Sequence, residues 1–174
     1  MIHLKSAVPL AIAAAAMACA SSPEPAAPKA PLYDNLGVYH HAVTTASPDA
    51  QKYFDQGLTL CFNFNHAEAI RSFEAAARAD TNCAMAWWGV AFAHGPNINA
   101  PMFEDAVPKA WEALQKAIQL KEQASTRERD YIDALMVMYA DYDKLTHGQR
   151  MRALRDAQAE VAAKYPDDDE AQIA

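Results

Sequence analysis

One thiol and four imidazoles are candidate ligands for a soft metal ion: Cys61, His66 and His94, with His40 and His41. Cys61 and His94 fall near the ends of two expected helices and His66 follows a turn, so we expect these three at one end of the helical layer. Thiolate and imidazole suit copper(I) or zinc. The adjacent histidines precede the first helix and could fold towards the others. No pair of these residues has C-x-x-C or H-x-x-x-H spacing. Two structural roles therefore stay open: His66 could cap its helix, and His94 could satisfy a turn.

Recognised catalytic patterns are absent from the sequence. It contains no G-x-S-x-G turn, no phosphate-binding P-loop and no paired carboxylates in an apolar setting. Glu128, Asp130 and Asp133 are spaced along a helix face that we expect to be exposed, and His147 is expected in solvent at the start of another helix. The sequence therefore predicts a protein without catalytic activity and without a cofactor, copper or zinc being the alternative.

A disulfide between Cys61 and Cys83 is disfavoured by helix geometry. Cys61 lies near the end of its expected helix and Cys83 at the start of the next parallel one. An offset of about twelve residues corresponds to roughly 18 Å at the rise of an α-helix, whereas bridged Cα atoms lie within about 7 Å. We expect both thiols to be buried, because cysteine packs like a small hydrophobic residue.

The N-terminus has the order of an export signal. A single charge at Lys5 precedes an apolar run that is too short to span a bilayer as a helix, and residues 1–20 are predicted to be a leader. Cleavage could follow Ala20, or Cys19 could be lipidated, because residues 16–19 resemble a bacterial lipobox. Residues 21–47 are a proline-rich tether and N-terminal extension. We expect a periplasmic or outer-membrane-anchored protein that meets the membrane only through such a lipid anchor.

Composition favours one acidic, helical domain. The chain has 174 residues, a formal net charge of −7, 52% hydrophobic residues and only 5 glycines. The acidity argues against nucleic-acid binding, which needs clustered Lys and Arg to neutralise phosphates. Alanine is the commonest residue, and it favours helices.

Helix-start signals divide the chain after residue 47. Ser47 precedes a proline, while Asn65, Ser125 and Thr146 are each followed three residues later by Glu or Gln, as in a capping box. The expected helices cover residues 51–62, 66–79, 83–93, 107–120, 126–141 and 147–164, with the beginning of a further helix at 167–174.

The first helix pair carries a repeat-like spacing of small and aromatic residues. These residues, separated by 4, 3, 9, 4 and 3 positions and followed by Asp80, are Tyr53, Gly57, Leu60, Ala69, Phe73 and Ala76. The pattern resembles the tetratricopeptide repeat (TPR), a unit of about 34 residues, although Thr81 replaces the usual proline. Glycine and alanine would stand where the two helices cross closely.

The resemblance implies an all-α solenoid of three units. They would cover residues 48–82, 83–122 with an inserted loop at 95–102, and 123–166. Repeat arrays need polar capping helices, so the start of a further helix at 167–174 implies more repeats of the same array, or a partner at that end.

The resemblance also implies a concave groove that binds partners. Its lining would be Phe54, Leu58, Cys61, Phe62, Met85, Trp88 and Phe92. This apolar groove would hold a protein or peptide partner, or else the chain's own segment 32–45 through Tyr33, Leu36, Val38, Tyr39 and Val43. The sequence therefore predicts an exported TPR scaffold for protein–protein interaction, the alternative being a periplasmic copper- or zinc-binding repeat protein.

Overall fold

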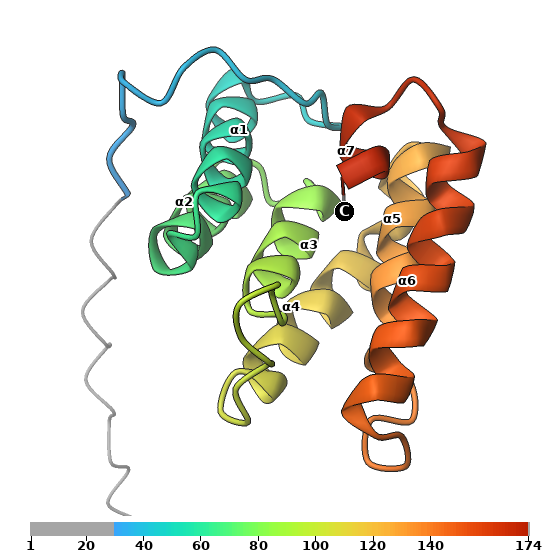
Figure 1. Cartoon of the computed structure of the whole chain (residues 1–174). Coiled ribbons are helices and arrows are strands. Elements are labelled where there is room, and N and C mark those ends of the chain that lie inside the picture. The colour runs from blue at the N-terminus through green and yellow to red at the C-terminus, as the bar shows by residue number, and fades with distance from the viewer. Residues whose placement is uncertain (1–29, 174) are drawn as a thin grey trace, which may run out of the picture.

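The computed structural model describes residues 30–173, which are all-α as the sequence predicts, without a strand in that range (Figure 1). The leader at 1–20, with Cys19, and the first part of the tether lie outside the described residues. No helix within 30–173 has the length and apolar character needed to cross a bilayer. The helices are α1 (Pro48–Phe62), α2 (His66–Ala79), α3 (Ala84–Ala93), α4 (Val107–Gln119), α5 (Thr126–Met136), α6 (His147–Lys164) and α7 (Asp169–Ile173), with a short 3-10 helix η1 (Lys121–Gln123) between α4 and α5.

Three of the four predicted helix caps are present. The Ser47 hydroxyl accepts a hydrogen bond from the Ala50 N–H at 3.2 Å, and complete capping boxes begin α5 at Ser125 and α6 at Thr146. Asn65 was expected to cap α2, but its side chain accepts no capping hydrogen bond. Three caps therefore fix where α1, α5 and α6 begin, because each satisfies an N–H group that the helix itself leaves without a partner.

Helix ends differ from the sequence-based expectation mainly in α5. This helix was expected to extend to residue 141, but it ends at Met136 and a series of turns follows. The N–H groups of Met138 and Tyr139 bond three residues back, to Leu135 and Met136. These tight turns bury both Met138 and Tyr139, whereas a regular helix would separate neighbouring side chains by about 100°. Smaller differences are that α1 begins at 48 and α3 at 84.

Consecutive helices pack against each other in pairs. α1 packs on α2, α3 on α4 and α5 on α6, while α2 with α3, and α5 with both α3 and α4, join the pairs (Figure 1). One hydrophobic core extends through all three pairs.

Phe73 is the central side chain of the first two pairs. It is fully buried, and a Cβ added to Gly57 or Gly89 would lie only 2.5 or 2.4 Å from its ring. α1 and α3 can therefore approach α2 this closely only because both positions lack a side chain. The predicted close approach at Gly57 is confirmed, and Gly89 supplies a second one.

Residues 30–47, the strap, run extended along α1 and then cross towards α5 and α7 (Figure 1). The Tyr53 hydroxyl donates to the Ala30 carbonyl at 3.1 Å, and Gln56 donates to Pro31 at 2.8 Å. At the other end, Arg127 on α5 donates to the Ala42 carbonyl at 2.8 Å. Side chains of the helices thus satisfy backbone groups that an extended segment cannot pair by itself.

Candidate functional site

An open apolar groove of about 520 Å³ lies where the α1–α2 turn, the end of α3 and α6 meet. Its lining residues are Cys61, Phe62, Phe64, His66, Phe92, Pro96, Asn97, Ile98, Met151, Leu154 and Gln158. Aromatic, aliphatic and thioether groups dominate this surface, and a few polar groups interrupt it. This is the usual composition of a site for an apolar ligand or side chain.

Three of the seven predicted groove residues, Cys61, Phe62 and Phe92, line this groove. The prediction is wrong for Phe54, Leu58 and Met85, which are at most 1% exposed and belong to the core. Phe54 lies against the Phe73 ring, with 5.4 Å between centroids, so the inner face of α1 is used for helix packing. The seventh residue, Trp88, lines a neighbouring cavity.

Phe64 is a groove residue that the sequence reasoning missed. Phe64 follows α1 with a φ angle of 61°, in the left-handed region. The residue is 54% exposed. Its N–H donates to Cys61 and that of Asn65 to Leu60, so the last turn of α1 is closed by this conformation. A side chain other than glycine costs about 1–2 kcal/mol there. The signal available in the sequence was an aromatic residue between two asparagines in the turn after the first expected helix.

Ile98 is the most exposed member of the groove, at 90%. It stands on the inserted loop, where the Asn97 carboxamide oxygen accepts from the N–H groups of Asn99 at 2.8 Å and Ala100 at 3.1 Å. Such Asx contacts fix the turn without neighbouring strands or helices. The loop thus presents a large aliphatic side chain to solvent at the edge of the groove.

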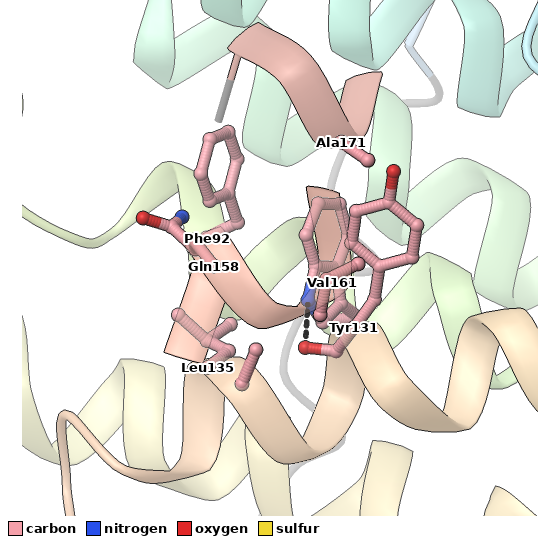
Figure 2. Close-up of a pocket in the computed structure, with 8 residues that line it drawn as sticks. Phe92, Tyr131, Leu135, Gln158, Val161 and Ala171 are labelled. Carbon is pink, nitrogen blue, oxygen red and sulfur yellow. Dashed lines mark hydrogen bonds between the residues drawn. The ribbon is translucent and has the colours of Figure 1, made fainter. Parts of the chain in front are cut away.

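A smaller inner cavity adjoins the groove (Figure 2). Trp88, Tyr131, Val161 and Ala171 line it together with Phe92 and Gln158, and the last two also line the groove. The Trp88 indole N–H donates to the Tyr131 carbonyl at 3.1 Å, the dashed contact in Figure 2. The Trp88 and Phe92 rings stack at 5.0 Å. Shared lining by Phe92 and Gln158 makes the inner cavity an extension of the groove.

The five candidate metal ligands do not converge. Cys61 and His66 line the groove, but His94 does not and its charged neighbours are on other elements, at Lys109, Glu74 and Asp105. Burial lowers the pKa of His94. Within residues 30–173, no three His, Cys, Asp or Glu side chains form a group that could hold a metal ion.

His40 and His41 lie on the strap, away from the groove. His40 contacts Asp55 at 2.8 Å, while His41 is 3.7 Å from Asp168 with its side chain 10% exposed. Burial is the largest influence on His41 and lowers its pKa, and Arg127 adds to this while Asp168 opposes it. These imidazoles therefore hold the strap in place.

Both described cysteines are buried and unbonded, as expected. Burial raises the pKa of Cys61 to about 12 and that of Cys83 to about 11. Neither is a thiolate near neutral pH, so neither is an activated nucleophile.

The strap does not fill the groove in the way the sequence suggested. Val38 is 99% exposed, Tyr33 and Tyr39 are also exposed, and only Leu36 and Val43 pack partly on the core. Polar side chains on α1, such as Gln51 and Gln56, bond the strap's backbone instead. The strap therefore lies outside the groove, held by hydrogen bonds more than by apolar contact.

The expectation that the carboxylates of α5 are solvated is wrong for Glu128, and it holds in part for Asp130 and Asp133, whose side chains are 26% and 48% exposed. Glu128 is 1% exposed and receives hydrogen bonds from the strap and from Ser125. Asp130 accepts from Lys164 and Tyr165, and Asp133 pairs with Lys121. These groups hold elements together, whereas His147 is exposed as expected.

No protein-family model, curated protein or solved structure matches this chain.

Proposed function

We propose that the chain is an exported, non-catalytic scaffold of the tetratricopeptide type that binds an apolar segment of a protein partner in the groove. The TPR-like spacing of residues 53–76 and the pairwise packing of consecutive helices support the scaffold. The groove supports the binding.

One observation carries the proposal: three large apolar residues around one groove are exposed. Phe62 is 37% exposed, Phe64 54% and Ile98 90%. Scattered exposed apolar residues are normal, but a contiguous patch around a concave surface is typical of interaction sites. In peptide-binding grooves, most of the affinity comes from aromatic and aliphatic side chains that the bound peptide buries.

Selection of random peptides by phage display tests the proposal without knowledge of the partner. We expect the enriched peptides to share large apolar anchors. Their affinity should fall at least about tenfold, or about 1.4 kcal/mol, in Phe64→Asn and in Ile98→Asn. Asparagine tolerates the left-handed conformation at position 64, so the first variant removes the ring and retains the turn.

Val38→Asn is the matched control, because Val38 is 99% exposed but lies on the strap and does not line the groove. It should bind the enriched peptides as the unmodified protein does. Failure to enrich any peptide, or equal loss of affinity in all three variants, would contradict binding in the groove.

Copper(I) binding in the same groove is a second candidate function. Cys61 and His66 line it together with the thioether of Met151, and all three are donors that suit copper(I). His66 Nδ1 lies 3.2 Å from the Phe64 carbonyl. Donation to this oxygen leaves Nε2 as the ligand nitrogen, the usual arrangement for a metal-binding histidine.

Competition against a copper(I) chelator under reducing conditions tests this second function. The unmodified protein and Cys83→Ser should retain copper(I), while Cys61→Ser and His66→Asn should each lose at least about tenfold in affinity. Cys83 is the matched control because its thiol is fully buried in the core. Equal retention by all four proteins, or none by the unmodified protein, would exclude this site.

A further inference from the structure

Helix α7 closes the inner cavity. In Figure 1 it lies between α3 and α5, and Figure 2 shows Ala171 on α7 at the cavity lined by Tyr131 and Val161. Ala171 is 4% exposed, and Trp88 on α3 lines the cavity from the other side. A short helix of five residues is therefore the cover of an apolar space that continues into the groove through Phe92 and Gln158.

The seat of α7 contains an unpaired buried carboxyl group. Glu170 is 5% exposed, and its Oε1 atom has no hydrogen-bond partner within residues 30–173. A neutral carboxyl group can be buried in this way at moderate cost, but a carboxylate without a partner is strongly unfavourable. Burial raises the pKa of Glu170 to about 7. The side chain next to Ala171 thus opposes docking of α7 when it is ionised.

The charged side chains closest to this part of the chain contact Asp168, two residues before Glu170, and not Glu170 itself. Arg127 on α5 lies 3.3 Å from Asp168, and His41 on the strap lies 3.7 Å from it. These contacts fix the chain just before α7. Beyond Glu170, Gln172 donates to the Ala162 carbonyl on α6 at 3.0 Å, which is a neutral contact and does not depend on pH in this range.

We propose that α7 is a pH-dependent plug, which is seated while Glu170 is protonated and is released when Glu170 ionises. Release removes the cover of the inner cavity, which then lengthens the groove, and exposes Trp88. The release itself does not require the groove to bind a partner, whereas its consequence, a longer apolar binding site, rests on the proposed function.

The direction of the pH effect follows from the two states of Glu170. Free in solution its pKa is near 4.5, and in the seated helix it is about 7. Below pH 4.5 both states are neutral and docking is strongest. As the pH rises to 7 the released state loses its proton first, and docking weakens by up to about 300-fold.

Quenching of Trp88 fluorescence by acrylamide measures the release without any ligand. The full chain carries Trp87→Phe and Trp111→Phe, so that Trp88 is the only indole. Between about pH 5 and 8, which includes the range in which docking weakens, the quenching constant should rise at least about twofold. Any protonation of His41 at the acidic end of this range also occurs in Glu170→Gln, so comparison with that variant isolates the effect of Glu170.

Three variants define the outcome. Glu170→Gln should remain weakly quenched at every pH, and the permanently charged Glu170→Lys should be strongly quenched at every pH. Asp169→Asn is the matched control, because Asp169 is the exposed neighbour on the same helix, and it should keep the pH dependence. Quenching that does not change with pH in the unmodified Glu170 protein, or that changes equally in Glu170→Gln, would overturn the plug. Since no peptide is present, either result leaves the groove proposal to its own test.

Discussion

Glu128 on α5 accepts two hydrogen bonds from Thr44 on the strap, 84 residues earlier in the chain. The Thr44 N–H donates to Oε1 at 2.5 Å and its hydroxyl donates to Oε2 at 2.5 Å. The same carboxylate accepts the Ser125 N–H at 2.7 Å and so completes the capping box of α5. One buried side chain therefore starts a helix and also fastens the strap, which begins on α1, to the third helix pair.

A double-mutant cycle between Thr44→Val and Glu128→Gln should detect this connection. Hydrogen bonds to a charged group contribute about 1.5–3 kcal/mol each, and a buried carboxylate that loses a partner pays for its desolvation. We expect a coupling energy of at least about 1 kcal/mol in the free energy of unfolding, measured by urea denaturation. A coupling below about 0.5 kcal/mol, the error of additivity for independent sites, would mean that Thr44 and Glu128 are not linked in solution.

The same residue shows how far sequence reasoning extends. The capping box of Ser125 with Glu128 was predicted because its residues are three positions apart and the motif is local. The burial of Glu128 was not predicted, because its second partner, Thr44, is distant in the sequence and no local pattern relates the two. The 4-3-9-4-3 spacing likewise indicated close packing at Gly57, which the structure shows.

The groove was predictable only on the side formed by neighbouring helices. Phe62 and Phe92 belong to successive helix pairs, and the resemblance placed both at the groove. Met151 and Leu154 on α6 form its opposite side, but their position depends on how the third pair packs. Phe54 was misplaced because the resemblance assigned its side of α1 to the groove, whereas in the structure Phe54 packs on the Phe73 ring in the core.

Gly57→Ala should destabilise the fold through overpacking. The new Cβ would lie 2.5 Å from the Phe73 ring, which is fully buried and cannot move without disturbing α2 and α3. We expect a loss of about 1–3 kcal/mol in the free energy of unfolding, although alanine is the better helix former. Gly148→Ala is the control, since the nearest atom there is 3.6 Å away on a flexible arginine. It should stabilise the protein by about 0.5–1 kcal/mol, and an equal effect of both substitutions would contradict the close approach.

The two buried thiols should react slowly with iodoacetamide. In a Cys19→Ser background, which leaves Cys61 and Cys83, the pKa values of about 12 and about 11 compare with 9.0 for a free thiol. At about pH 8 the thiolate fraction, and with it the rate, should be at least about 100-fold lower than in the urea-unfolded chain. Mass spectrometry of quenched samples gives the rate of each cysteine. Rapid labelling of either thiol in the folded protein would show that it is accessible or activated.

Acidification should loosen the strap through His41. Burial lowers the pKa of His41 from the ordinary 6.5, so the unfolded chain takes up this proton more readily than the folded protein. The contribution of neutral His41 is complete above pH 6.5 and declines as the pH falls below it, by at most about 1.4 kcal/mol per pH unit.

Glu170 has the opposite pH dependence, and the measurement is therefore made in Glu170→Gln. In this background, the free energy of urea unfolding should fall more steeply on acidification from about pH 7.5 to 5 when His41 is present than when it is replaced in His41→Gln. The exposed neighbour provides the control, because His40→Gln should retain the slope, and identical slopes in all three proteins would show that His41 does not carry the pH dependence.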